Sequence, residues 1–235
     1  MESGITGIVL AGGRSRRFGS DKLATVLAGR PLVEHAIDAL ATVADEVVVV
    51  IAADAVPGTA GAPGQGSGPV PPGVRAVHAA AEVRPWLRVV RDGMPDAGPL
   101  AGFLAGAWAA HHPALVVVAG DQPALVPDVL ALLAARVGMP AADGLPTPRA
   151  AQLAATGAAE DGVPLPFAAD RDAAVVAAEG LLRDGARSLR ALLLTLGAAT
   201  IPAATWRQLD PDGATLRDVD VPADLPATPV ARRAP

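Results

Sequence analysis

The sequence predicts an α/β fold in which a mostly parallel central sheet carries helices on both faces, and three observations favour it. Strand-like and helix-like segments alternate about four times in residues 1–136, which is the pattern of a parallel sheet with right-handed crossovers. The run Glu46–Ile51 is nearly all valine, as in a parallel strand that is covered on both faces. A glycine-rich loop directly follows the first strand, at the position where such sheets bind ligands.

The first half of the chain contains the regular part of this pattern. Helical spacing predicts helices that begin at Pro31 and Pro127 and one over 98–111, since proline is well tolerated in the first turn of a helix. Residues 54–73 are rich in Gly, Pro and Ala, so we expect an exposed, mobile loop there. Apolar runs predict strands at 5–10, 46–51, 87–91 and 115–119.

The second half is less regular. The chain of 235 residues is long enough for one large domain or two small ones. We interpret residues 1–226 as a single domain and 227–235 as a disordered, Pro-rich tail. Within the second half, the expected helices cover 170–183 and 187–196, and the expected short strands cover 152–155, 199–202 and 215–219.

The composition excludes several classes of protein. There is no cysteine, so disulfides, thiolate nucleophiles and cysteine zinc sites are ruled out. A net charge of −5 and an aromatic content of 3% argue against a general nucleic-acid binder, which needs a cationic surface and stacking rings. The start of the chain lacks a basic segment followed by an apolar run, and no apolar stretch approaches the length of a membrane span. We therefore expect a soluble cytoplasmic protein.

The loop from Leu10 to Lys22 carries most of the functional information. It reads Leu-Ala-Gly-Gly-Arg-Ser-Arg-Arg-Phe-Gly-Ser-Asp-Lys, and its glycines let backbone N–H groups approach phosphate oxygens. Arg17 and Lys22 supply positive charge for a triphosphate and then for a departing pyrophosphate. Walker A and dinucleotide loops do not match, because a phenylalanine replaces the second Walker glycine and Gly12 and Gly13 are adjacent. The alternative interpretation is a basic surface turn.

Two further motifs follow predicted strands. Asp92 follows the third strand, and six residues later Gly98–Gly102 reads Gly-Pro-Leu-Ala-Gly, where small residues let a helix N-terminus approach a ligand. Asp121 follows the apolar run near residue 118. A carboxylate at this edge suits Mg²⁺, which proteins hold by one or two carboxylates plus substrate phosphates. The alternatives are a simple loop before a proline-started helix and an aspartate that caps a turn.

Together these motifs resemble those of the molybdenum cofactor guanylyltransferases, a MobA-like nucleotidyltransferase family with a Rossmann-like three-layer fold. Leu-Ala-Gly-Gly is typical of the guanylyltransferases, whereas related cytidylyltransferases usually show Leu-Ala-Ala-Gly. The resemblance implies that Arg17, Lys22 and Asp121 are catalytic and that Asp121 binds Mg²⁺. The residues that it assigns to nucleotide binding are Leu10, Ala11, Gly12, Gly13, Arg14, Lys22, Asp92, Gly98, Pro99, Leu100 and Asp121.

The C-terminal half resembles the family more loosely. Its last motif, Asp218–Leu225, has the Asp-x-Asp form of cytidylyltransferases rather than the Asn-x-Asn of guanylyltransferases. Asp220 is either a second Mg²⁺ ligand or the cap of a short helix that a proline opens. Residues 162–167 lie where the family has a segment that faces the acceptor. Arg187 and Arg190 are either contacts to an acceptor phosphate or locally paired side chains.

The resemblance implies Mg²⁺-dependent transfer of GMP from GTP to molybdopterin, which releases pyrophosphate and forms molybdopterin guanine dinucleotide. The expected partners are GTP, molybdopterin or Mo-molybdopterin, and molybdoenzyme apoproteins or their chaperones; neither nucleic acid nor a membrane is expected. Three alternatives stay open: cytidylyl transfer from CTP to molybdopterin, nucleotidyl transfer to a sugar-1-phosphate, and a catalytically silent nucleotide-binding module.

Overall fold

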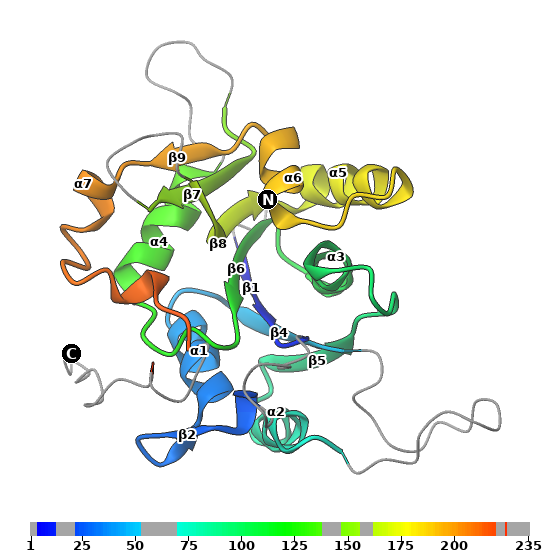
Figure 1. The fold of residues 1–235 in the computed structure, drawn as a ribbon, viewed down its shortest axis with the longest axis vertical. Coiled ribbons are helices and arrows are strands. Elements are labelled where there is room, and N and C mark those ends of the chain that lie inside the picture. The colour runs from blue at the N-terminus through cyan, green and yellow to red at the C-terminus, as the bar shows by residue number, and fades with distance from the viewer. Residues whose placement is uncertain are drawn as a thin grey trace.

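The computed structural model describes residues 4–12, 22–52, 70–137, 147–155, 162–219 and 224. Its main feature is a seven-stranded sheet in the order β5-β4-β1-β6-β8-β7-β9, to which both halves of the chain contribute (Figure 1). The strands of this sheet are β1 (Ile5–Leu10), β4 (Glu46–Ile51), β5 (Leu87–Arg91), β6 (Ala114–Ala119), β7 (Ala150–Ala154), β8 (Gly162–Asp170) and β9 (Ala199–Ile201).

The sheet is mostly parallel, as predicted. β1 pairs in parallel with β4 on one side and β6 on the other, and β5 extends the parallel set beyond β4. Among the described strands of the sheet, β8 alone runs in the opposite direction. Leu10 is in register with Val50 and with Ala119, so the ends of three neighbouring strands lie at the same edge.

Helices cover both faces of the sheet, which confirms the three-layer α/β prediction. One hydrophobic cluster joins α1, α2 and α4 to one face, and a second joins α3, α5 and α6 to the other (Figure 1). The helices are α1 (Leu32–Ala41), α2 (Pro72–Glu82), α3 (Pro99–Ala109), α4 (Pro127–Arg136), α5 (Arg171–Arg183), α6 (Leu189–Thr195) and the short α7 (Ala203–Trp206). None of the helices in the described ranges is long and apolar enough to cross a bilayer.

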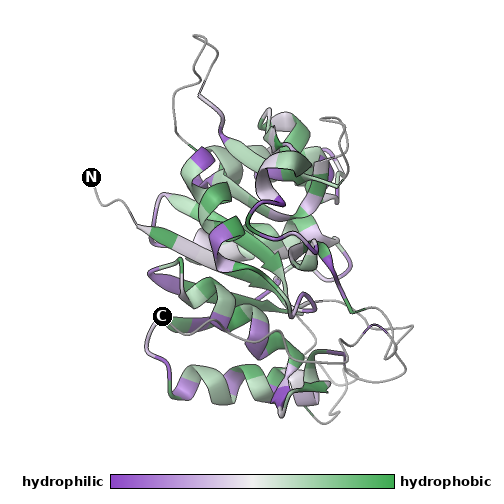
Figure 2. Ribbon diagram, turned by 90° about the vertical axis from the view of Figure 1, so that its left-hand side faces the viewer, coloured by the Kyte–Doolittle hydropathy of each residue, from purple (hydrophilic) through white to green (hydrophobic). Residues whose placement is uncertain are grey.

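The strands explain why two separate clusters form. Successive side chains of a strand point to opposite faces. Val47 and Val49 of β4 therefore pack in the first cluster, whereas Val48 and Val50 pack in the second. A strand that is buried on both faces must be apolar at every position, and this is the valine run that the sequence shows. Figure 2 shows mostly hydrophobic colouring on the central strands, with hydrophilic residues on the helices and turns.

Helix α2 corrects one prediction. The last two residues of the predicted loop are helical, because α2 begins at Pro72 with that proline in its first turn; residues 53–69 lie outside the described ranges. The apolar residues Val74, Val77 and Ala80 are buried on one face of the helix, which is helical spacing. Because the segment is rich in Gly, Pro and Ala, this short amphipathic pattern was not recognised in the sequence.

The second half differs from the prediction at two places. Residues 162–170 form strand β8, the longest described strand of the sheet, which was not among the predicted strands. Proline cannot donate a hydrogen bond to a sheet, so the two prolines of this segment weaken its strand signal in the sequence. Residues 215–219 do not form a strand: a 3₁₀ turn, η2 (Ala214–Leu216), begins there, and the following residues are irregular. The carboxylate of Asp210 accepts the N–H groups of Ala214 and Thr215 and thereby caps this turn.

A small hairpin precedes α1. After the 3₁₀ turn η1 (Lys22–Ala24), strands β2 (Val26–Leu27) and β3 (Arg30–Pro31) pair in antiparallel fashion. Ala28 and Gly29 adopt positive φ angles of 52° and 80° at its tip, as a two-residue hairpin turn requires. The predicted helix begins directly after Pro31, at Leu32.

Candidate active site

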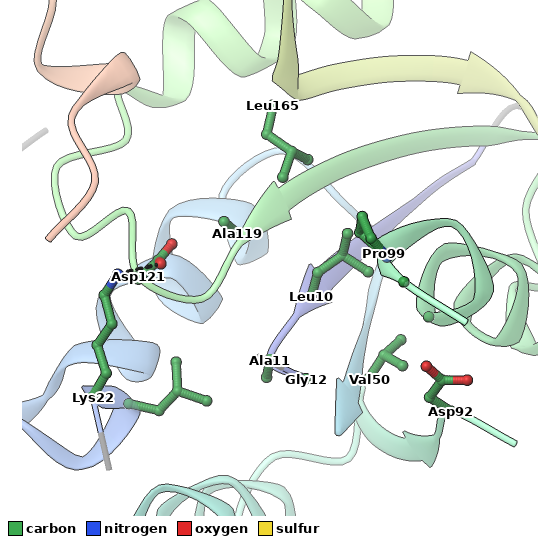
Figure 3. A pocket seen from close by; sticks show the side chains of 13 residues that line it. Leu10, Ala11, Gly12, Lys22, Val50, Asp92, Pro99, Ala119, Asp121 and Leu165 are labelled. Carbon is green, nitrogen blue, oxygen red and sulfur yellow. Dashed lines mark ion pairs between the residues drawn. The ribbon is translucent and has the colours of Figure 1, made fainter. Parts of the chain in front are cut away.

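A pocket of about 200 Å³ opens at the carboxyl edge of the parallel strands. Leu10, Val50 and Ala119 line it, and these are the residues that strand pairing brings into register. Figure 3 shows Lys22 and Asp121 together on one side of the pocket and Asp92 on the other. In open α/β sheets this edge is the usual place for a ligand.

Most of the predicted site residues that the structure describes meet in this pocket. Leu100 is the exception, because its side chain is fully buried in the second hydrophobic cluster. Gly13, Arg14, Arg17 and Asp220 lie outside the described residues. The predicted residues that line the pocket are Leu10, Ala11, Gly12, Lys22, Asp92, Gly98, Pro99 and Asp121.

Five lining residues were not among the predicted site residues. Leu23, Val50 and Ala119 are apolar neighbours of predicted residues, and Gly102 ends the quoted Gly-Pro-Leu-Ala-Gly motif. Leu165 reaches the pocket from β8 (Figure 3). It lies in the segment 162–167 that the resemblance places beside the acceptor. Apolar residues of this kind carry no sequence signal of their own, since only strand order brings them to the pocket.

Lys22 and Asp121 form the charged pair of the site. The Lys22 ammonium lies 2.7 Å from the Asp121 carboxylate, with the two side chains 10% and 26% exposed. Lys22 comes from the start of η1, and Asp121 from the turn after β6. Residues 99 positions apart in the chain (121 − 22) are thus held together at the pocket wall. The arrangement provides one cation and one anion within reach of the same ligand.

Asp92 provides a second carboxylate across the pocket. Its backbone N–H donates to the carbonyl of Ile51 at 2.9 Å, which ties it to the end of β4. One carboxylate oxygen accepts the N–H of Met94 at 2.9 Å. The other, Oδ2, faces the first turn of α3, where it would lie 3.8 Å from a Cβ atom at position 102. This side of the pocket can accept hydrogen bonds from a ligand.

Two glycines let the backbone come close at the pocket. A Cβ atom on Gly12 would lie 3.3 Å from the backbone nitrogen of Ala52, so the loop passes tightly against the end of β4. Gly98 has a φ angle of 80°, and a Cβ atom there would lie 2.8 Å from the carbonyl oxygen of Arg187. Any side chain at position 98 therefore meets both an unfavourable φ and a backbone clash.

Two backbone N–H groups at the start of α3 are paired within the protein. The N–H of Leu100 donates to the carbonyl of Arg187 at 3.2 Å. The N–H of Ala101 donates to the carbonyl of Gly98 at 3.1 Å. The Arg187 guanidinium donates in turn to the Asp96 carbonyl, which supports local pairing over an acceptor-phosphate contact for this arginine. The α3 segment therefore offers the ligand a small-residue surface made of Gly98, Pro99 and Gly102.

The chemistry of the pocket fits one divalent cation bound together with a phosphorylated ligand. Within the described ranges, no group of three or more His, Asp or Glu side chains is arranged to hold a metal ion. Mg²⁺ nevertheless needs only one or two carboxylates when substrate phosphates and water complete its shell. Asp121 meets that requirement because its carboxylate faces the pocket beside a lysine.

Several known proteins are similar in sequence to this chain. The probable molybdenum cofactor guanylyltransferase of Chloroflexus aggregans is 34% identical over 133 residues, covering 55% of this chain and 52% of the relative. The molybdenum cofactor guanylyltransferase of Burkholderia vietnamiensis is 39% identical over 133 residues, covering 55% and 54%. The chain thus spans about half the length of the curated relatives it matches.

The fold also matches a solved structure across nearly its whole length. Molybdopterin-guanine dinucleotide biosynthesis protein A from Archaeoglobus fulgidus superposes with a TM-score of 0.66 at 20% identity, covering 94% of each chain. At that identity the likeness shows the fold alone. The family model described as the MobA-like NTP transferase domain matches residues 7–199, which include every described residue of the pocket. The chain belongs to the family of MobA-like NTP transferase domains.

Proposed function

We propose that the chain transfers GMP from GTP to molybdopterin, releasing pyrophosphate and forming molybdopterin guanine dinucleotide. The observation that carries this proposal is the Lys22–Asp121 pair at one side of a pocket whose other side presents Asp92. Family membership supports nucleotidyl transfer, and the names of the relatives supply the acceptor and the nucleotide. The small-residue surface of α3 lies beside Asp92 and leaves room for a nucleoside (Figure 3).

Lys22 is assigned to the phosphates of the nucleotide. Its ammonium sits at the pocket wall, where it neutralises negative charge that develops on the departing pyrophosphate. Asp121 holds Mg²⁺, which supplies further neutralisation of the phosphate oxygens when bound. Arg17, in the loop before Lys22, is assigned to the same phosphates on the sequence motif alone.

The bond changes require no general base. An oxygen of the acceptor's terminal phosphate forms a bond to the α-phosphorus of GTP, and the bond from that phosphorus to the bridging oxygen of the β-phosphate breaks. Pyrophosphate leaves with the electron pair of the broken bond. Because the attacking phosphate is already anionic, the protein contributes positioning and charge neutralisation.

Asp92 and the α3 segment are assigned to the nucleoside. Asp92 Oδ2 faces the first turn of α3, and Leu10, Ala11 and Gly12 approach the same space from β1. A pocket of this shape favours a flat, hydrogen-bonding ligand group between small residues. Leu165, on β8, extends the pocket wall toward the acceptor side.

Cytidylyl transfer is the second candidate, because two sequence features favour it: the Gly-Asp-Gln-Pro run of residues 120–123 and the last motif. The last motif, Asp218–Leu225, has the Asp-x-Asp form of cytidylyltransferases. The Leu-Ala-Gly-Gly opening favours GTP instead, and three of its four residues, Leu10, Ala11 and Gly12, line the pocket. We therefore place GTP first.

The test is pyrophosphate release by purified protein with Mg²⁺ and molybdopterin or Mo-molybdopterin, with GTP, CTP, ATP or UTP supplied in separate reactions. We expect release with GTP and a dinucleotide product of matching mass. Preference for CTP would instead indicate a molybdopterin cytidylyltransferase. Nucleotide binding without pyrophosphate release, with molybdopterin and with sugar-1-phosphates alike, would support a silent nucleotide-binding module.

A further inference from the structure

The turn that carries Asp121 is held in place by a segment about 90 residues further along the chain. Asp121 lies in the connection between β6 and α4, which runs from Gly120 to Val126. Residues 210–219, which include η2, pack beside this connection and make three hydrogen bonds to it. Such contacts between distant segments fix a loop that would otherwise be free to move.

The three hydrogen bonds hold the connection near its start, at Asp121 and Gln122, and at its end, at Val126. The Val126 N–H donates to the Thr215 hydroxyl at 3.1 Å, at the start of α4. The Gln122 side-chain amide donates to the Thr215 carbonyl at 3.5 Å. The Val219 N–H donates to the carbonyl of Asp121 itself at 3.1 Å.

Gln122 also holds the end of β6. Its side-chain oxygen accepts the backbone N–H of Ala119 at 3.0 Å. The backbone N–H of Gln122 donates to the Ala119 carbonyl at 3.3 Å. Only 4% of Gln122 is exposed, and Thr215 is fully buried. Buried polar groups of this kind are costly to leave unpaired, so their geometry is tightly specified.

Asp210 sets the position of Thr215. Its two carboxylate oxygens accept the N–H groups of Ala214 at 2.9 Å and Thr215 at 2.7 Å. Asp210 is itself 4% exposed, and two short backbone hydrogen bonds orient it. Gln122, Asp210 and Thr215, which we call the Thr215 clamp, thus connect η2 to the aspartate turn through buried groups.

We propose that Thr215 and Gln122 are positioning residues for the metal-binding carboxylate of Asp121. This inference rests on the proposed function, because it assumes that Asp121 holds a divalent cation. None of the three clamp residues lines the pocket, so they act through the backbone of residues 119–126. Partners that orient a metal-binding side chain affect metal affinity by roughly 10–100-fold when removed.

Thr215→Val is the principal test, since it removes the hydroxyl and keeps the branched shape. We expect it to weaken Mn²⁺ binding in the presence of GTP by about tenfold, measured by the electron paramagnetic resonance signal of free Mn²⁺. It should also raise the Mg²⁺ concentration needed for half-maximal transfer. Thr215→Ser keeps the acceptor for Val126 and should stay close to wild type in both measurements.

Thr6→Val is the matched control. Thr6 is also fully buried, and its hydroxyl donates to Glu46 and accepts the N–H of His112, but it lies at the opposite edge of the sheet. We expect Thr6→Val to lower the melting temperature without changing Mn²⁺ affinity. Gln122→Met supplies a second disruption of the clamp if Thr215→Val fails to fold.

The outcomes separate this inference from the proposed function. If Thr215→Val or Gln122→Met lowers only the melting temperature, as Thr6→Val should, the clamp is merely structural and the inference is wrong. If wild-type protein with GTP binds no Mn²⁺, Asp121 holds no cation and the inference falls together with the magnesium role. Transfer of a different nucleotide, with the Mn²⁺ effects as expected, would change the proposed function and leave the inference standing.

Discussion

The two edges of the parallel strands place their charged residues in different surroundings. At the edge where the strands begin, Glu46 is 8% exposed and accepts hydrogen bonds from the Thr6 hydroxyl at 2.7 Å and Arg88 at 2.8 Å. It also accepts the His111 N–H at 2.7 Å. At the edge where the strands end, Lys22 and Asp121 face a pocket.

The pairing at the first edge fixes the charge state of Glu46. Burial by itself would raise the pKa of the Glu46 carboxyl, but hydrogen bonds from His111, Thr6 and Arg88 and the charge of Arg88 lower it below its ordinary value. The carboxylate is thus kept ionised by protein groups. At the other edge the same kind of side chain is aimed at a space that a ligand can enter, so we assign stability to the first edge and chemistry to the second.

The largest expected effect tests the edge where the strands end, which carries Lys22 and Asp121. Asp121→Asn keeps the size of the side chain but removes its charge, so we expect transfer to fall by at least about 10²-fold. The melting temperature should change little, because Asp121 is partly exposed at the pocket wall. Initial rates of pyrophosphate release and thermal unfolding check this. Transfer close to the wild-type rate would remove Asp121 from the proposed site.

The next effect tests the edge where the strands begin, which carries Glu46. Glu46→Gln removes the charge that pairs with Arg88 and changes the hydrogen bonding at Thr6 and His111, which we expect to cost about 2 kcal/mol of unfolding free energy. The transfer rate at a temperature where the variant is folded should stay near wild type. Urea unfolding and initial rates measure the two quantities. A large loss of transfer with intact stability would contradict the assignment of stability to the Glu46 edge and of chemistry to the opposite edge.

Glu46 also predicts how stability depends on pH. Its folded pKa is lowered from the ordinary value of 4.5, so the folded state binds this proton less readily than the unfolded state. The stabilisation is present above about pH 4.5 and is lost as the pH falls through the lowered folded pKa. We expect the unfolding free energy of wild type to fall more steeply than that of Glu46→Gln in this acid range. Parallel slopes in urea titrations at several pH values would contradict this.

Sequence reasoning succeeded where local pattern determines the structure. The valine run of β4 and the proline-started helices α1 and α4 were predicted near their observed bounds, because each carries its own apolar period. The pocket motifs were predicted for a related reason: Gly12, Asp92 and Asp121 all follow strands, and parallel strands end at one edge.

Features that depend on distant contacts were not predicted from the sequence. Leu165 reaches the pocket only because β8 pairs with β6 in antiparallel fashion. The link between Gln122 and Thr215 joins residues 93 positions apart (215 − 122), and neither position shows a local pattern. Glu46 looked like the start of a strand, and its hydrogen bonds come from three other segments. These positions are set by strand order and packing.

The smallest expected effect concerns the ion pair between Lys22 and Asp121. In the structure the Lys22 ammonium lies against the carboxylate to which we assign the metal ion. A divalent cation must therefore compete with this ammonium until the phosphates of a nucleotide attract it. Lys22→Met should bind Mn²⁺ without nucleotide about fivefold more tightly than wild type, which corresponds to the roughly 1 kcal/mol of a partly exposed ion pair.

The same variant should lose transfer, so the two readouts move in opposite directions. Lys22→Met removes the charge assigned to the phosphates, and its transfer rate should fall even though the metal binds more tightly. Asp121→Asn is the control for the metal site, because it should abolish the Mn²⁺ binding that Lys22→Met strengthens. If Lys22→Met binds Mn²⁺ no more tightly than wild type, the ion pair does not oppose the metal, and Lys22 acts on the phosphates alone.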